Sequence, residues 1–263
     1  GIPASGHELL FRTILKGEWD FQGFVVSDWA SITQMVPHGY SADHKEAAKQ
    51  AVKAGVDMEM ESPAYKDHLK ELVEEGAIDV ALLDDAVRRI LRIKFALGLF
   101  DNPYTDSSLY PALLNENNLA AAKEAAVQSA VLLKNDGNVL PLSQDTKVAV
   151  LGPLADAPHE QLGTWAFDGN REFSQTPIMA LRDLLETDQI QYVPTLEYSR
   201  SKDMSKFNDA VEAAENSDVV LMFLGEEAIL SGEAHCLANI DLPGVQQELV
   251  KAVAETGKPI VLI

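Results

Sequence analysis

The sequence contains a single cysteine, Cys236, so no disulfide can form within the chain. Basic residues are also scarce, because 21 Lys and Arg stand against 41 Asp and Glu and leave a formal net charge of −20. Such an acidic surface repels phosphate backbones and anionic membranes, so we expect neither nucleic acid nor a membrane as a partner. No apolar run approaches the ~20 residues that cross a bilayer. A neutral ligand such as a sugar remains compatible with this charge.

Cofactor and metal motifs are also missing. There is no glycine-rich dinucleotide or phosphate pattern, and His38, His159 and His235 stand far from any metal-ligand spacing, so we expect no cofactor and no metal. The sequence also lacks a starting Met and a signal-peptide pattern, and it ends inside the apolar run at residues 260–263. We therefore expect a segment of a longer protein.

Short apolar runs alternate with helical patterns, which is typical of parallel sheets covered by helices on both faces. Strands are expected at residues 24–27, 56–60, 131–133, 148–151, 219–224 and 260–263. Helices are expected at residues 7–16, 43–54, 80–97, 119–129, 207–214 and 243–257, and Thr176-Pro177 predicts one more helix start.

Two local patterns define boundaries. Asp43 and Glu46 match a capping box at the start of one helix, and Gly55 ends it. Residues 101–118 show neither a strand nor a helix period and predict a linker. The expected domains are therefore residues 1–100 and residues 119–263.

A carboxylate and an indole, Asp28 and Trp29, follow the buried strand expected at residues 24–27. Ligand sites of parallel α/β proteins lie at the carboxyl ends of strands. Sugars stack on aromatic rings, and paired carboxylates break glycosidic bonds. The pattern fits a sugar site; the alternative is that Asp28 only caps a short helix at residues 30–36.

An acidic, glycine-punctuated loop follows the very apolar strand expected at residues 219–224. It contains Glu226, Glu227 and Glu233 and precedes a helix start at Pro243. The loop is a second candidate for chemistry; the alternative is a solvated acidic loop. Spacing alone cannot pair it with Asp28, because only a fold that brings the two domains together can do so.

A third acidic group, Asp57, Glu59 and Glu61, alternates along the chain and so shares one face of the expected strand. Three carboxylates can bind a divalent cation. They can also line the polar mouth of a barrel, and this second interpretation is favoured.

Several segments together resemble family 3 of the glycoside hydrolases, which contains β-glucosidases and β-xylosidases. Residues 23–29, Gly-Phe-Val-Val-Ser-Asp-Trp, resemble the nucleophile motif of that family. Further similar segments follow in the same order at residues 54–60, 87–94, 97–100, 130–135, 140–142 and 150–156. The resemblance covers essentially the whole chain and overrides the capping interpretation of Asp28.

The resemblance implies an α/β fold in which residues 1–100 are the C-terminal part of a (β/α)8-like barrel and residues 119–263 are an α/β sandwich domain. It implies that Asp28 is the nucleophile and Glu233 the acid/base, with Glu226 and Glu227 as competitors for the second role. Trp29 and Met60 are expected to bind the substrate.

The chain departs from the family in two respects. Leu237 stands where relatives have an arginine near the acid/base residue, which leaves the charge partners of Glu233 open. The first barrel strands, which supply other residues that hold the sugar, are not in this sequence.

The implied activity is retaining hydrolysis of terminal β-linked glucose from oligosaccharides or aryl β-glycosides, without a cofactor. The alternatives are a β-xylosidase, a β-N-acetylglucosaminidase or a non-catalytic fragment that binds sugar. The second domain and the Glu233 loop argue against the β-N-acetylglucosaminidase branch. The resemblance favours a periplasmic or secreted protein, with the cytoplasm as the alternative, and leaves a homodimer open.

Overall fold

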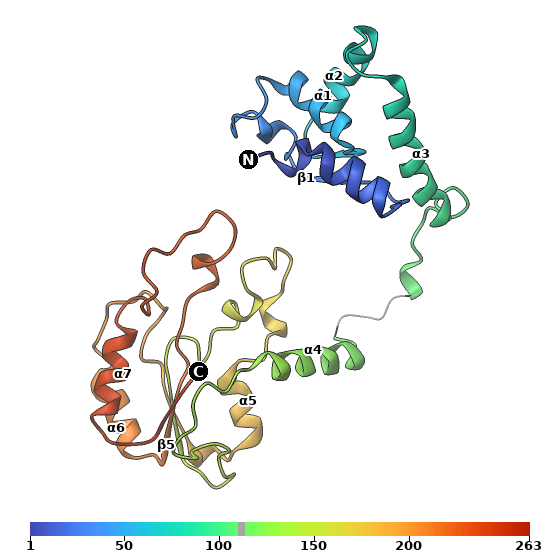
Figure 1. Cartoon of the computed structure of the whole chain (residues 1–263). Helices are drawn as coiled ribbons and strands as arrows, with labels where there is room; N and C mark the ends of the chain where they lie inside the picture. The colour runs from blue at the N-terminus through green and yellow to red at the C-terminus, as the bar shows by residue number, and fades with distance from the viewer. Residues whose placement is uncertain (110–113) are drawn as a thin grey trace. The chain divides into compact units, whose positions relative to one another are not determined.

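The computed structural model describes residues 1–109 and 114–263 and divides into two compact units, Gly1–Ala120 and Ala121–Ile263 (Figure 1). Residues 110–113 of the predicted linker lie outside the described residues. Each unit has a parallel sheet of its own. No helix in the described part of the chain is long and apolar enough to cross a membrane.

The first unit packs helices against two parallel strands, β1 at Val26–Trp29 and β2 at Met58–Met60. Val26 lies opposite Met58 and Trp29 opposite Met60, with an irregularity between them. The helices are a π-helix at Leu9–Glu18, α1 at His44–Ala54, α2 at Ala64–Glu74 and α3 at Val80–Ala96. Short 3-10 turns lie at Ala4–Gly6, Thr33–Met35 and Ser107–Leu109.

Helix α1 has the boundaries that its local sequence predicts. The Glu46 N–H donates to Asp43 Oδ1 at 2.8 Å, and Glu46 Oε2 accepts from the Ala42 N–H at 2.8 Å. Gly55 follows with a φ of +107°, a left-handed conformation that glycine adopts without strain. The buried face of α1 then packs into the core of this unit through Ala47, Ala48, Ala51 and Val52.

Strand β1 begins two residues later than predicted and is not buried throughout. The Val25 N–H is taken by the Asp57 carboxylate, so regular pairing starts at Val26. Of the four β1 residues only Ser27 is buried, while Val26 is 43% exposed and Trp29 is 63% exposed. In this chain β1 pairs only with β2 among the described strands, and most of its residues are exposed.

The second unit is built on a four-stranded parallel sheet in the order β4-β3-β5-β6. The strands are β3 at Val148–Leu151, β4 at Ile190–Val193, β5 at Val219–Met222 and β6 at Ile260–Leu262. Its helices are α4 at Glu116–Ser129, α5 at Pro177–Leu184, α6 at Phe207–Glu215 and α7 at Gln246–Ala254. Helix α4 begins in the first unit, because the division between the units falls after Ala120.

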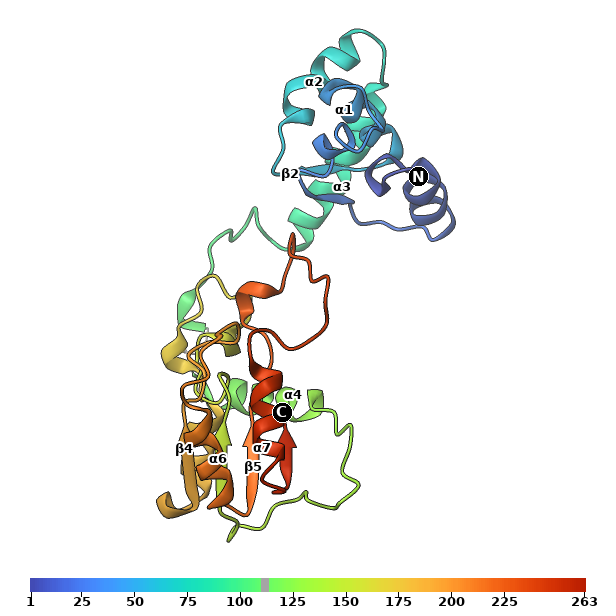
Figure 2. The same ribbon diagram turned by 90° about the vertical axis from the view of Figure 1, so that its left-hand side faces the viewer.

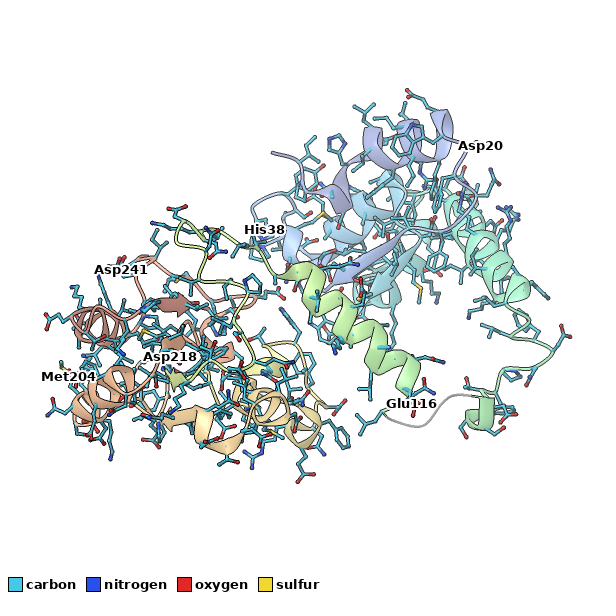
Figure 3. All side chains as sticks on the ribbon, turned by 90° about the horizontal axis from the view of Figure 1, so that it is seen from below. Asp20, His38, Glu116, Met204, Asp218 and Asp241 are labelled. Carbon is cyan, nitrogen blue, oxygen red and sulfur yellow. The ribbon has the colours of Figure 1, made fainter. Side chains whose placement is uncertain are left out.

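Side chains of β3 and β5 are buried on both faces of this sheet. Ala149 and Met222 pack towards α6 and α7, while Val148 and Leu221 pack towards α5. Figure 2 looks onto α6 and α7 in front of the strands. At the amino end of the sheet, the Lys147 N–H donates to Asp218 Oδ2 at 2.9 Å; Figure 3 labels Asp218. Two-sided burial explains why these strands read as continuous apolar runs.

The strand expected at residues 131–133 does not form. Val131, Leu132 and Leu133 are 75%, 66% and 92% exposed, and the segment has no strand pairing. An apolar run becomes a strand only when a neighbouring strand takes its backbone hydrogen bonds. No described strand pairs with these residues.

Candidate active site

The carboxyl ends of β1 and β2 bring Asp28, Trp29 and Met60 together. Trp29 lies opposite Met60, and both are exposed, by 63% and 38%. The Met60 N–H donates to Ser27 Oγ at 2.8 Å, and the Ala30 N–H donates to the Met60 carbonyl at 2.9 Å. Bonds on both sides of Asp28 and Trp29 therefore fix their backbone to the end of β2.

The carboxylate of Asp28 does not cap the turn that follows it. That turn spans Thr33–Met35, its N-cap residue is Ile32, and no side chain caps it. Asp28 is exposed, and no described residue donates a hydrogen bond to its carboxylate. The capping interpretation is wrong, and the side chain is free to meet a ligand.

The backbone turns sharply immediately after both strands. Ala30 follows Trp29 with a φ of +54°, and Glu61 follows Met60 with a φ of +59°. A non-glycine residue in this left-handed region costs about 1–3 kcal/mol and persists where surrounding structure holds it, most often at functional sites. The strain lies beside the residues that the sequence marks as a sugar site.

Asp57 and Glu59 each have structural partners in the described residues. Lys16 Nζ lies 2.6 and 2.8 Å from the two Asp57 oxygens, and both side chains are almost fully buried. Burial lowers the pKa of the Lys16 ammonium, and the Asp57 carboxylate opposes that shift. Glu59 accepts the N–H groups of Ala64 and Tyr65 at 3.1 and 2.6 Å.

Glu59 thereby anchors the start of α2, which explains a helix that the local sequence does not predict. Asp57 also accepts the Val25 N–H at 2.8 Å, so it ties the beginning of β1 to β2. No group of three metal-ligating side chains occurs among residues 1–109 and 114–263.

Asp57→Asn is expected to lower the free energy of unfolding by about 3 kcal/mol, because it leaves the buried Lys16 charge without a carboxylate. The double variant Lys16→Met/Asp57→Asn should recover part of that loss. Lys70→Met, which removes an exposed lysine 3.6 Å from Glu74, should change stability by less than about 0.5 kcal/mol. Urea unfolding of the intact protein at pH 7 measures all three. A loss below about 1 kcal/mol for Asp57→Asn would contradict the buried-pair account.

In the second unit, the loop after β5 contains the other predicted carboxylate. Glu233 is exposed and accepts no hydrogen bond from the residues that the structure describes. It stands between Gly232 and Ala234, whose φ angles are +111° and +63°. His235 Nδ1 lies 2.9 Å from the Ser231 carbonyl oxygen and closes the tip. The loop thus presents Glu233 on a tightly turned backbone.

Glu227 is committed to holding the loop in place. Its Oε2 accepts from Ser199 Oγ at 2.7 Å and from Arg200 Nε at 2.9 Å. The Arg200 guanidinium holds the pKa of the Glu227 carboxyl below its usual range, so this group stays ionised. An ionised, paired carboxylate is a poor proton donor, which favours Glu233 over Glu227 for the acid/base role.

Gln246 holds the two ends of the same loop, Gly225 and Pro243, by hydrogen bonds. Its fully buried side-chain nitrogen lies 2.8 Å from the Gly225 carbonyl oxygen and 3.0 Å from those of Pro243 and Ser199. Its oxygen accepts the Gly225 N–H at 2.9 Å. Sequence analysis misses this residue, because a glutamine in the first turn of a helix carries no signal for such contacts.

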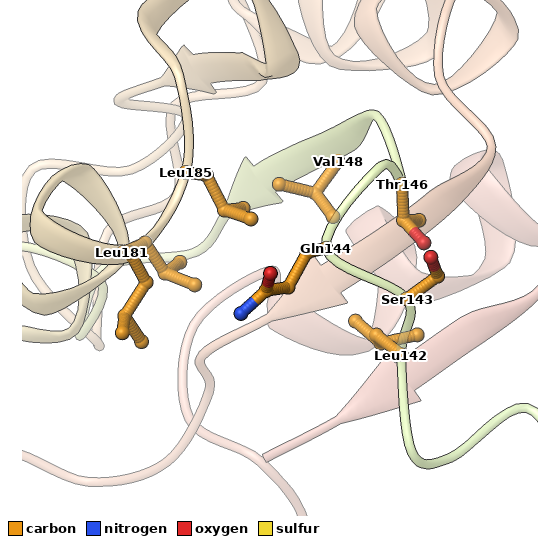
Figure 4. Close-up of a pocket in the computed structure, with 8 residues that line it drawn as sticks. Leu142, Ser143, Gln144, Thr146, Val148, Leu181 and Leu185 are labelled. Carbon is orange, nitrogen blue, oxygen red and sulfur yellow. The ribbon is translucent and has the colours of Figure 1, made fainter.

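A pocket at the other end of the sheet has a different character. It is lined by four leucines and Val148, with Ser143, Gln144 and Thr146 as its polar members (Figure 4). It lies beside the first residue of β3, Val148, whereas ligands of parallel sheets bind at the carboxyl ends of strands. Without a carboxylate this pocket does not suit glycoside chemistry. The pairing of Asp28 with Glu233 spans the two units and stays a prediction.

Comparison with known proteins gives consistent matches to one group. A model of the glycosyl hydrolase family 3 N-terminal domain matches residues 1–93, and one of the family's C-terminal domain matches residues 130–263. A periplasmic β-glucosidase of Salmonella typhimurium is 33% identical over the whole chain, which spans 38% of that protein. A putative β-xylosidase of Formosa agariphila is 32% identical, and the chain spans 35% of it.

A crystal structure of β-glucosidase from Listeria innocua in complex with isofagomine superimposes with a TM-score of 0.91 at 39% sequence identity. The match covers 99% of this chain and 36% of that one. The fold predicted from the sequence, the C-terminal part of a (β/α)8-like barrel followed by an α/β sandwich, is confirmed.

Proposed function

The chain belongs to glycosyl hydrolase family 3, and we propose that the protein carrying it is a retaining exo-β-glycosidase that removes terminal non-reducing β-D-glucosyl residues. The observation that carries the proposal is Asp28, which is exposed, caps no helical turn and lies beside Trp29 at the carboxyl end of β1. A free carboxylate beside an indole at that position suits attack on a sugar that stacks on the ring.

In the proposed mechanism Asp28 attacks the anomeric carbon and forms a covalent glycosyl-enzyme. Glu233 gives a proton to the leaving oxygen and then takes one from the water that releases the sugar. These roles require the two carboxyl groups to lie about 5–5.5 Å apart when substrate is bound. Trp29 and Met60 would contact the sugar, and neither step uses a cofactor.

Glucose is the sugar we propose, because solved structures of the Listeria innocua β-glucosidase carry glucose and, in a variant, laminaribiose. The substrate class is therefore β-linked glucosyl oligosaccharides and aryl β-glucosides. A β-xylosidase is the second candidate, which the similarity to the Formosa agariphila protein supports. Comparing kcat/KM for the 4-nitrophenyl β-glucoside and β-xyloside distinguishes the two.

We also propose a location outside the cytoplasm. The Salmonella typhimurium relative is a periplasmic protein, and it is similar over the whole of this chain. Fractionating cells that produce the intact protein and assaying β-glucosidase in each fraction tests this location.

The stereochemistry of hydrolysis tests the proposed reaction. We expect the first-formed sugar from an aryl β-glucoside to be β-glucose, because two successive displacements retain the anomeric configuration. Proton NMR of the intact enzyme's reaction, recorded before mutarotation, distinguishes the two anomers. Initial release of α-glucose would show a single displacement by water and would remove the role of nucleophile from Asp28.

A further inference from the structure

The loop after β3 bonds directly to the loop that carries Glu233. Thr164 Oγ1 lies 2.7 Å from the Ala228 carbonyl oxygen and 2.7 Å from the Ser231 carbonyl oxygen. The Glu160 carboxylate, which belongs to the same loop as Thr164, accepts the Ala228 N–H. The short helical turns at Glu160–Leu162 and Ala228–Leu230 are also in contact.

Thr164 also supports the residue next to Glu233 by packing. A Cβ added to Gly232 would lie only 2.5 Å from Thr164 Cγ2, so the glycine backbone rests directly on this methyl group. Gly232 has a φ of +111°, a backbone conformation that residues other than glycine rarely adopt. One side chain thus contacts the Ser231 and Ala228 carbonyls, which share its hydroxyl hydrogen, and the backbone of Gly232 through its methyl group.

These contacts end one residue before Glu233, whose own side chain has no partner in the described residues that would fix it. A general acid must come within ~2.6–3.2 Å of the atom that it protonates. A displacement of ~1 Å can reduce the rate by ~100-fold. The position of Glu233 therefore depends on the backbone that precedes it, and that backbone depends on Thr164.

We propose that Thr164 is a positioning residue for proton transfer by Glu233. The inference rests on the proposed function. It adds a residue through which the loop after β3 determines the position of the Glu233 carboxyl group. Glu160 and Thr164 connect the loops after β3 and β5, and Thr164 makes the contacts nearest to Glu233, through its hydroxyl at Ser231 and its methyl group at Gly232.

The test compares two substrates that differ in their need for a proton. A 2,4-dinitrophenyl β-glucoside loses its leaving group without protonation, whereas methyl β-glucoside requires it. Thr164→Val keeps the shape but removes the hydroxyl. In the intact enzyme, it should lower kcat/KM for the methyl glucoside by ~10- to 100-fold and for the dinitrophenyl glucoside by less than ~3-fold. Thr164→Ser keeps the hydroxyl and removes only the methyl group beside Gly232, so its loss on the methyl glucoside should be smaller than that of Thr164→Val.

The ratio of the two kcat/KM values does not depend on how much protein is folded, because unfolded enzyme lowers both values equally. Gly232→Ala provides a second variant, since its methyl group must push against Thr164, and it should shift the ratio in the same direction. Equal losses on both substrates, or no loss, in the two variants would overturn the proposal.

Glu233→Ala distinguishes a failure of the role proposed for Thr164 from a failure of the acid/base role proposed for Glu233. If it changes the ratio and Thr164→Val does not, Thr164 does not position Glu233 and the proposed function stands. If Glu233→Ala itself leaves the ratio unchanged, Glu233 is not the acid/base and the proposed assignment fails with it.

Discussion

Replacing Asp28 with alanine is expected to lower kcat on β-glucosides by ~10⁴-fold or more, because removing the nucleophile removes the covalent route. Added azide should restore part of the activity on an activated aryl β-glucoside and release the α-glucosyl azide. The small anion enters the space left by the carboxylate and attacks the same face of the sugar. Steady-state rates with and without azide, and proton NMR of the product, measure both effects.

Asp84→Ala is the matched control for the loss of Asp28. Asp84 is an exposed carboxylate on α3 whose nearest cation is Arg88, at 3.6 Å. Its removal should leave kcat within about 2-fold of wild type, since exposed ion pairs contribute little. If Asp28→Ala kept a tenth of the wild-type kcat, Asp28 could not be the nucleophile.

Glu233→Ala should produce a different pattern. We expect kcat/KM for methyl β-glucoside to fall by ~10²- to 10⁴-fold, the usual contribution of general acid–base catalysis. The value for the 2,4-dinitrophenyl β-glucoside should change far less, because that leaving group needs no proton. Azide should raise kcat and give the β-glucosyl azide, since it attacks the glycosyl-enzyme from the side that the water uses.

Glu226→Ala tests the same assignment within the same loop. Glu226 is exposed and seven residues before Glu233, so its removal also takes one carboxylate from the loop. Its rates on both substrates should match those of wild type. If Glu226→Ala gave the azide product and Glu233→Ala did not, the acid/base role would belong to Glu226.

The features predicted best from the sequence are those with local causes. Helix α1 depends on Asp43, Glu46 and Gly55, which act within a few residues of the helix ends. The central strands β3 and β5 are buried on both faces, and their uninterrupted apolar runs reveal them. Strand β4 escapes prediction because Gln191 interrupts its apolar run at the edge of the sheet.

Features that depend on distant contacts could not be predicted in this way. Asp57 pairs with Lys16, which is 41 positions away in the chain, so the local sequence does not reveal the partner of its carboxylate. Gln246 reaches Ser199 across 47 positions. The segment at residues 131–133 has the composition of a strand, but it lacks a paired neighbour among the described strands. Asp28 was identified through its motif, and the structure adds that its carboxylate caps no turn.

Trapping the glycosyl-enzyme tests the central claim most directly. The intact protein is incubated with 2,4-dinitrophenyl 2-deoxy-2-fluoro-β-glucoside, whose fluorine slows hydrolysis of the intermediate more than its formation. Peptide mass spectrometry then locates the sugar. The account predicts one fluoroglucosyl group per protein, on the peptide that contains Asp28. A sugar on a different carboxylate, or none on an enzyme that hydrolyses β-glucosides, would contradict it.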